Sequence, residues 1–460
     1  MKTQRNALQQ LALHGGAKAV ARIDGVGRPK IGIEEFLSVA KRFGFSKRTV
    51  RAIEAAIRAE DLGLGPFLGH YYANLRQTSV EAFEQLACDV FESKYALGVS
   101  SGTGALHSAF VAAGCRPGTE VICAAIGFYA TAAAVIQAKA VPVFCDVDAS
   151  LGMDPKKIEA LITPRTVAIA PTHVMGSVCD MGAIMKVARK HGLNVIEDCA
   201  QSCGATFRGK RIGTFGDFGC FSISSYKIIG GGEGGLVLTK TKRDWERANQ
   251  FAESGGLWRP DRFAPPRYAN ELFPGTNYRM SELEAAVDVE QLKRLNGFVS
   301  RFRKVKRQIT SRLKTYAEIV PQMLNDAEGE VGYTIRFYPA TMDLGKHIVD
   351  ALQAEGISAG FRGRNAKPDW HVYSNMFPVT LQTSAYGREC VFGCPHYLKA
   401  GGQVRYARGD CPVADDLFDR MISISTSQWF AASDCRNIAV GITKVLDAYC
   451  TRDSAGAPWF

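Results

Sequence analysis

Between residues 80 and 240, short runs of β-branched and apolar residues alternate with segments whose apolar residues recur at helical spacing. Apolar runs without polar interruption predict strands that are buried on both faces. We therefore predict an α/β domain with about seven mostly parallel strands, covered by helices on both sides. The predicted strands are YALGVSS, EVICAAIG, VPVFCDVD, VAIAPTHV, NVIEDCA, FGCFSIS and GGLVLTK. Between them we predict helices from residue 104 onward and over about 129–138, 155–161 and 181–191.

The remaining sequence predicts three further parts. Residues 1–75 are helical and irregular, with a clear helix in VRAIEAAIRAEDLG. Residues 281–314 keep helical spacing throughout and predict one long helix or two placed end to end. A chain of 460 residues exceeds one typical core. We thus expect a large domain over 76–280, the helix 281–314 as a link, and a smaller α/β domain over 315–460.

The chain is basic, with a formal net charge of +11. Its basic runs, such as RFRKVKRQITSRLK, allow either nucleic-acid binding or a solvated helix face. In this run Phe302, Val305, Ile309 and Leu313 recur at helical spacing, which places the basic residues on the polar side. We therefore expect no nucleic-acid partner.

Cysteine usage and hydropathy indicate a soluble intracellular protein. The 13 cysteines are odd in number and lie mostly in apolar runs, as buried free thiols in a reducing compartment do. The closest pairs, Cys199 with Cys203 and Cys390 with Cys394, have CxxxC spacing, so we expect no metal site. No apolar run approaches the roughly 18 residues of a membrane helix, and the start lacks a signal-peptide core. We expect a cytoplasmic protein without membrane contact.

Three strand ends carry the candidate chemistry, because ligands of such sheets bind at the carboxyl ends of the strands. The first is VSSGTGALHSAF, where Ser-Gly-Thr-Gly opens a helix and presents free N–H groups and the Thr103 hydroxyl to an anion. The stretch matches neither GxGxxG nor the P-loop pattern. Taken alone, it is equally well explained as an ordinary strand-to-helix turn.

The second strand end, VIEDCAQSCGA, places Asp198 after an apolar strand. A buried carboxylate needs a partner. That partner is either a basic group or backbone amides of the fold, or the protonated nitrogen of a heterocycle that the carboxylate keeps charged. Gln201, three positions later, can reach a second polar atom of the same ring.

The third strand end, FSISSYKIIGGGEGG, supplies Ser222 and Lys227. A phosphate-binding loop would carry its glycines before the lysine, whereas here they follow it. Small neighbours leave room for a planar cofactor if Lys227 forms a Schiff base, and Ser222 can then bind a phosphate. The pattern thus favours covalent chemistry at Lys227.

From about Ser79 to the C-terminus, the chain resembles the DegT/DnrJ/EryC1/StrS family of pyridoxal-phosphate-dependent sugar and cyclitol aminotransferases. This family has the fold type of aspartate aminotransferase, fold type I. The motifs that carry the resemblance are KYALGVSSGTGALHSAF, AVPVFCDVD, the long stretch from LITPRTVAIAPTHV to NVIEDCAQSCGA, GGGEGGLVLT and GTNYRMSELEAAV.

The resemblance implies a role for each matching residue. Lys227 is the Schiff-base lysine, Asp198 the partner of the pyridine nitrogen, and Gln201 the neighbour of the ring hydroxyl. The other implied cofactor contacts are Thr103, Gly104 and Ser222 at the phosphate, Phe128 of IGFYAT stacked on the ring, and Asn277 of GTNYRM reaching the phosphate of the neighbouring subunit. A homodimer is therefore implied as well.

The expected activity is amino transfer from glutamate or glutamine to a ketone on a sugar or cyclitol. Two alternatives are a related enzyme that dehydrates a deoxysugar and a regulatory protein without activity. Dehydratase relatives replace the lysine by histidine, and an inactive protein would have lost Lys227 or Asp198, so both alternatives are disfavoured. Candidates for the acceptor pocket are His371, Tyr373 and His396, with Arg279 and Arg405 as candidate anion contacts.

Overall fold

The computed structural model describes residues 2–22, 29–60, 63, 65, 67–69, 78–256, 258–363, 368–387 and 390–460. The chain forms two compact units, Met1–Asn74 and Leu75–Phe460. This division does not separate residues 76–280, 281–314 and 315–460, so the predicted boundaries between those parts stay a prediction.

The first unit is helical. It contains α1 (Lys2–Gln9), the 3₁₀ helix η1 (Ala12–His14), α2 (Ile33–Lys41) and α3 (Lys47–Arg58). Ser46 caps α3, because its Oγ accepts the N–H of Thr49 at 3.1 Å. Helix α2 buries Leu37 and Ala40.

The second unit is built on a seven-stranded sheet with the order β1-β9-β8-β5-β4-β2-β3. Its strands are β1 (Tyr95–Val99), β2 (Glu120–Ala124), β3 (Val141–Cys145), β4 (Thr166–Ala170), β5 (Asn194–Asp198), β8 (Phe218–Ser222) and β9 (Gly235–Thr239). Six of these strands are parallel to one another, and β9 runs antiparallel to its neighbours β1 and β8. All seven predicted strands and the mostly parallel sheet are confirmed.

Successive strand residues point to opposite sides of the sheet, and here both sides are apolar. Helices therefore cover both faces. Ile122 and Val195 join one core with helices α4 (Ser79–Phe91), α8 (Met181–His191) and α10 (Glu282–Lys293). Val121 and Ile196 join the other core with α5 (Gly102–Ala112) and α9 (Lys242–Ala252), beside α6 (Ala130–Gln137). The short elements α7 (Pro155–Ile158), η2 (Glu159–Leu161), β6 (Thr206–Phe207) and β7 (Lys210–Arg211) complete this part.

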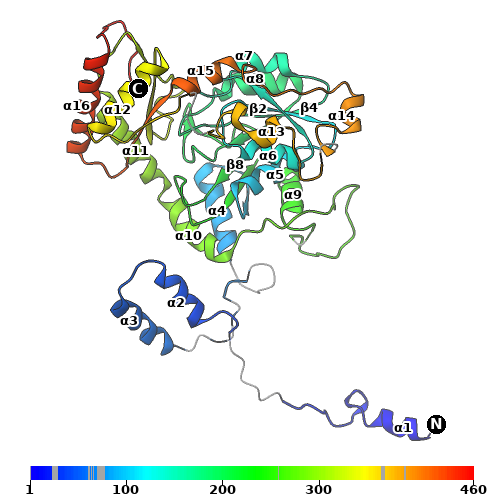
Figure 1. Ribbon diagram of the computed structural model, residues 1–460. Coiled ribbons are helices and arrows are strands. Elements are labelled where there is room, and N and C mark those ends of the chain that lie inside the picture. Colours follow the sequence, from blue (N-terminus) through cyan, green and yellow to red (C-terminus); the bar gives the residue numbers. More distant parts are fainter. Residues whose placement is uncertain are drawn as a thin grey trace. The chain divides into compact units, whose positions relative to one another are not determined.

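A second sheet follows the helix link. The link consists of two helices, α10 and α11 (Leu295–Thr310). Of the two predicted arrangements, the structure has the two helices placed end to end and not one long helix. The small antiparallel sheet has the order β10-β11-β13-β12, with strands β10 (Ile319–Pro321), β11 (Thr334–Pro339), β12 (Ala359–Phe361) and β13 (Ile422–Ser425). Helices α11, α12 (Met342–Ala354) and α16 (Ala432–Tyr449) gather around it, apart from the large sheet (Figure 1).

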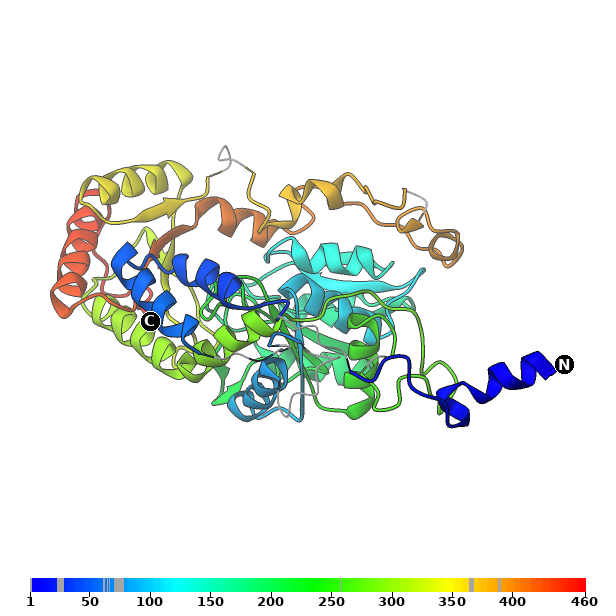
Figure 2. The same ribbon diagram turned by 90° about the horizontal axis from the view of Figure 1, so that it is seen from below.

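Part of the C-terminal sequence returns to the large sheet (Figure 2). This segment carries η3 (Tyr373–Asn375), α13 (Phe377–Thr380) and α14 (Pro395–Lys399), and α15 (Pro412–Arg420) leads back to the small sheet. Met376, Val379 and Tyr397 pack against residues of α6 and β3. A stretch after residue 315 therefore helps to build the region around the large sheet.

All 13 cysteines are free and ten of them are buried, which confirms the expectation of buried thiols. Among the described helices, none combines the length and the apolarity that crossing a bilayer requires.

Candidate functional site

The three predicted strand ends meet at one edge of the large sheet. The carboxyl ends of β1, β5 and β8 lie at this edge because these strands are parallel. Gly235, the first residue of β9, pairs with Val99 on one side and Ser222 on the other. A Cβ at Gly235 would lie 2.3 Å from the Ser101 carbonyl oxygen, so glycine allows the α5 start to approach β9 and β8.

The N-terminus of α5 offers free donors beside Ser222. Ser101 caps the helix, with its Oγ accepting the Gly104 N–H at 3.0 Å. Among the described residues nothing accepts the N–H groups of Gly102 and Thr103. Ser222 lies against this turn, because a Cβ on Gly102 would come within 2.6 Å of the Ser222 Cβ. The turn and the hydroxyl together form a place for an anion.

Asp198 is the last residue of β5 and is buried. One carboxylate oxygen accepts the Thr131 hydroxyl at 2.6 Å, and the other accepts the Ala200 N–H at 3.1 Å. Sequence reasoning missed Thr131, which lies in α6 and is itself 4% exposed. These two donors fix the carboxylate at the edge of the sheet.

Lys227 lies in a half-buried turn after β8. Its N–H donates to the Ser224 carbonyl at 2.9 Å, and Ser225 N–H donates to the Gly232 carbonyl at 3.0 Å. Burial lowers the pKa of the Lys227 amine, and the charge of Asp198 raises it in part. The structure therefore brings these two groups within electrostatic reach of each other.

Gln201 is buried with one end of its amide already fixed. Its Oε1 accepts the Met175 N–H at 2.9 Å. This bond orients the amide so that its NH₂ group remains as a donor, and no described residue accepts from it.

Phe128 follows β2 and is 44% exposed. Its ring lies 5.2 Å from the ring of His371, centroid to centroid. Three backbone bonds join the two segments: Gly127 N–H donates to His371 O at 2.9 Å, Tyr129 N–H to Trp370 O at 3.1 Å, and Tyr373 N–H to Ala125 O at 2.9 Å. His371 Nδ1 is in turn 2.6 Å from Asp369 Oδ1. Of the three acceptor candidates, His371 is the one beside a predicted cofactor residue.

Asn277 and Arg279 lie beside the end of β1. Arg279 pairs with Val99, and its N–H donates to Asn277 Oδ1 at 3.2 Å. Asn277 is exposed. Its predicted contact with a neighbouring subunit stays a prediction.

Three further candidates lie elsewhere. Tyr373 is buried and its hydroxyl is bonded to Ala407 O and Asp415, so it belongs to the core. His396 lies against Gly118, which precedes β2 at the opposite edge of the sheet. Arg405 is exposed and pairs with Asp410 at 3.5 Å. The side chains of Tyr373 and Arg405 are thus bonded to residues other than the predicted cofactor residues, and His396 lies at the opposite edge of the sheet.

A buried polar cluster underlies the site. His173, Glu197 and Cys199 place potential ligand atoms within 4.8 Å of one another. Cys179 N–H donates to His173 Nδ1, so the ring proton lies on Nε2, 3.1 Å from Glu197 Oε2. Burial alone would raise the pKa of Glu197, but His173 and backbone N–H groups lower it below its usual value. Hydrogen bonds of the fold thus account for this cluster without a metal.

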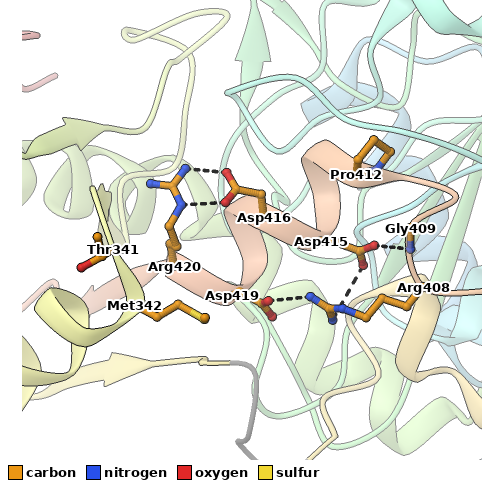
Figure 3. A pocket seen from close by; sticks show the side chains of 9 residues that line it. All are labelled: Thr341, Met342, Arg408, Gly409, Pro412, Asp415, Asp416, Asp419 and Arg420. Carbon is orange, nitrogen blue, oxygen red and sulfur yellow. Dashed lines mark hydrogen bonds and ion pairs between the residues drawn. The ribbon is translucent and has the colours of Figure 1, made fainter.

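A cavity of about 520 Å³ lies between α15 and the start of α12 (Figure 3). Its charged side chains are paired with each other. Arg408 contacts Asp415 and Asp419, and Arg420 contacts Asp416. None of the predicted site residues lines this cavity. The strand edge, and not this cavity, is therefore the candidate site.

Comparisons with known proteins identify the family of this chain. The chain matches the DegT/DnrJ/EryC1/StrS aminotransferase family over residues 73–362. It is 31% identical over 417 residues to an L-glutamine:2-deoxy-scyllo-inosose aminotransferase of Streptomyces kanamyceticus, covering 86% of this chain and 91% of that protein. It is 42% identical over 215 residues to a GDP-perosamine synthase of Caulobacter vibrioides, a match to 46% of this chain and 56% of the synthase.

Among solved structures, a 3-amino-5-hydroxybenzoic acid synthase matches with a TM-score of 0.64 and 26% identity, covering 80% of this chain and 91% of that one. The fold is therefore that of pyridoxal-phosphate-dependent aminotransferases. The chain is an aminotransferase and belongs to the DegT/DnrJ/EryC1/StrS family.

Proposed function

We propose that this aminotransferase binds pyridoxal phosphate at the carboxyl edge of the large sheet and acts on a keto sugar, a cyclitol or a similar ketone. The observation that carries the proposal is the pairing of Lys227 with Asp198 at that edge. An amine whose pKa is lowered by burial lies within reach of a buried carboxylate that two donors hold in place. Both groups lie at the edge where such sheets bind ligands.

The described residues fit the phosphate of this cofactor. Gly102 and Thr103 offer unpaired N–H groups at the positive end of α5, and Ser222 lies against the same turn. Gly104 contributes space, because its N–H is already bonded to Ser101 and a Cβ there would lie 3.2 Å from Tyr278 Cγ. The expected phosphate contacts are thus the hydroxyls of Thr103 and Ser222 with the free N–H groups.

The residues also fit a cationic heterocycle. Asp198 would hold a ring N–H by a charge-assisted hydrogen bond, while Thr131 keeps the carboxylate oriented. The NH₂ group of Gln201 would donate to the ring oxygen, because its Oε1 is occupied by Met175. Phe128 is exposed enough to cover one face of the ring.

When bound, pyridoxal phosphate supplies an aldehyde that exchanges amino groups and a ring that withdraws electrons. Lys227 would carry and move the proton that amino transfer requires. The lowered pKa increases the fraction of neutral amine, which is the form that accepts a proton and attacks a carbonyl. The charge of Asp198 opposes this lowering only in part, so the pKa of the Lys227 amine stays below its ordinary value.

The proposed amino donor is glutamate or glutamine. The support is the Streptomyces relative, whose name states glutamine as the donor and a cyclitol ketone as the acceptor, and which matches over 91% of its length. The dehydratase and inactive alternatives are disfavoured because position 227 is lysine and Asp198 is retained. A homodimer with Asn277 entering the neighbouring site is part of the proposal.

Absorbance spectroscopy tests the function. Purified protein incubated with pyridoxal phosphate should develop a band between about 400 and 430 nm that fades on adding glutamate or glutamine. Lys227→Ala should lose this band and turnover while still binding some cofactor through the phosphate and ring contacts. Lys240→Ala is the matched control: Lys240 follows β9 at the opposite edge of the sheet, and burial also lowers the pKa of its amine. A band that persists in Lys227→Ala would overturn the assignment.

A further inference from the structure

Residues 230–234, Gly-Gly-Gly-Glu-Gly, follow Lys227 and are called the glycine segment here. Helix α10 presents two carboxyl groups to this segment. Glu284 and Asp288 are one turn apart and therefore lie on the same side of the helix. A Cβ on Gly231 would lie 2.5 Å from Asp288 Oδ1, and a Cβ on Gly234 would lie 3.4 Å from both Asp288 Oδ2 and Glu284 Oε1. The glycines thus make room for these carboxyl groups.

Asp288 has no partner in this position. It is fully buried, and neither of its oxygens accepts a hydrogen bond from any described residue; the same holds for the buried Oε1 of Glu284. A buried carboxylate without donors is costly, so the uncharged acid is the stable form there. Burial followed by the charge of Glu284 raises the pKa of Asp288 to about 8, and burial raises that of Glu284 to about 7.

The charge of Glu284, on the same helix, reinforces this effect at Asp288. Glu233, in the glycine segment, acts on Glu284, and α4, which packs along α10, carries the half-buried Glu84. The basic residue nearest in sequence on α10, Lys293, is paired with Glu290. Among the described residues, the titratable group whose charge acts on Asp288 is therefore another acid, Glu284.

The glycine segment is hydrogen-bonded to the stretch that carries Lys227. Ile223 N–H donates to Gly234 O at 2.9 Å, and Gly231 N–H to Ile223 O at 3.3 Å. Ser225 donates to Gly232 O through its N–H at 3.0 Å and through its hydroxyl at 3.1 Å. A displacement of the glycine segment would therefore move the turn that holds Lys227.

We propose that Asp288 is a positioning residue for Lys227 and that it works in its protonated, uncharged form, with Glu284 as its companion. The uncharged acid packs under Gly231 and Gly234 without a counter-ion and holds the glycine segment against the Lys227 turn. Ionisation places two like charges in a buried site and pushes the segment away. This inference rests on the proposed role of Lys227 but adds residues that do not themselves touch the reacting groups.

The test compares Asp288→Asn with Asp288→Ala, using Glu290→Gln as the control on the exposed side of the same helix. The wild-type kcat should decline above about pH 8 as Asp288 ionises. Asparagine keeps the shape and lacks the charge, so Asp288→Asn should keep the wild-type kcat at pH 7 and should not show this decline. Alanine removes the support, so Asp288→Ala should lower kcat by about tenfold or more, with KM for the amino donor little changed. Glu290→Gln should keep the wild-type profile.

A second readout needs neither cofactor nor turnover. An acid whose pKa is raised by folding stabilises the protein at low pH, and this contribution is lost as pH rises through the folded pKa. The melting temperature of the cofactor-free wild type should therefore fall between about pH 5 and pH 8 more steeply than that of Asp288→Asn, with no further difference in slope above about pH 8. This readout remains interpretable if Asp288→Ala fails to fold.

Three outcomes would overturn the proposal. The first is a kcat of Asp288→Asn at pH 7 that is as low as the kcat of Asp288→Ala. The second is a decline of kcat above about pH 8 that is the same in Asp288→Asn and in wild type. The third is a wild-type melting temperature that rises with Na⁺ or K⁺ at constant ionic strength and fails to do so in Asp288→Asn, which would indicate a bound cation in place of the proton. Each leaves the absorbance test of Lys227 unaffected, so the two proposals fail separately.

Discussion

Glu197 gives the sharpest test of how the fold holds the site. Its Oε1 accepts the N–H groups of Phe215 and Gly216 at 2.8 and 2.7 Å, and its Oε2 accepts the Gly213 N–H at 2.8 Å and faces His173 Nε2 at 3.1 Å. The residue is fully buried and immediately precedes Asp198 on β5. Glu197→Gln replaces one of these oxygens with an NH₂ group at nearly unchanged volume.

The expected loss in free energy of unfolding follows from the number of hydrogen bonds that Glu197→Gln removes. In either orientation of the new amide, the NH₂ group faces two donors and two hydrogen bonds are lost. His173 cannot compensate by moving its proton, because its Nδ1 already accepts the Cys179 N–H. A hydrogen bond to a charged group contributes about 1.5–3 kcal/mol, so the expected loss is about 3–6 kcal/mol. This is a large part of the roughly 5–15 kcal/mol that stabilises a typical protein.

Urea unfolding measures the effect as a lower transition midpoint at unchanged slope. Glu328→Gln is the matched control, because Glu328 makes an exposed ion pair with Arg307 at 3.4 Å and its side chain is 79% exposed. Exposed pairs contribute about 1 kcal/mol or less. A loss below about 1 kcal/mol in Glu197→Gln would refute the bond count that underlies this prediction.

Two further changes test the proposed cofactor site. Thr131→Val removes the hydroxyl that donates to Asp198 and should weaken cofactor binding about tenfold to hundredfold, while Thr131→Ser should bind like wild type; equal dissociation rates in all three proteins would contradict this. Gly102→Ala adds a Cβ 2.6 Å from Ser222 Cβ and 3.0 Å from Ser222 Cα, so the turn must shift; cofactor binding should weaken by about tenfold or more, and the melting temperature should fall as well. Gly297→Ala in α11, where the added Cβ meets a flexible side chain at 3.3 Å, is the control, and similar cofactor affinities of the two variants would argue against a phosphate site at α5.

The strands and the strand-end chemistry were predictable because they depend on local patterns. Uninterrupted apolar runs marked all seven strands, and the residues that follow them marked Asp198 and Ser222. The direction of β9 was not predictable, because GGLVLTK has the same apolar pattern as the six strands that are parallel to one another. Direction depends on the length and path of the connection from β8, which the pattern does not record.

Contacts between residues that are far apart in the chain could not be predicted from the sequence either, because local patterns do not record them. Thr131 lies 67 positions before Asp198, and its alanine-rich helix gives no local sign that this residue faces β5. His396 was a candidate by residue type, but the path of the C-terminal segment places it against Gly118, at the opposite edge of the sheet. Residue type can nominate a side chain, whereas its position depends on packing between distant parts of the chain.

The three backbone bonds between residues 125–129 and 370–373 have a consequence for how this enzyme can diversify. They make Phe128 and His371 parts of one rigid wall, although some 240 residues separate them in the chain. An insertion near His371 would also shift the Phe128 ring, which we propose to face the cofactor. New acceptor preferences in this protein are therefore easier to reach by exchanging side chains on the wall than by rebuilding its backbone.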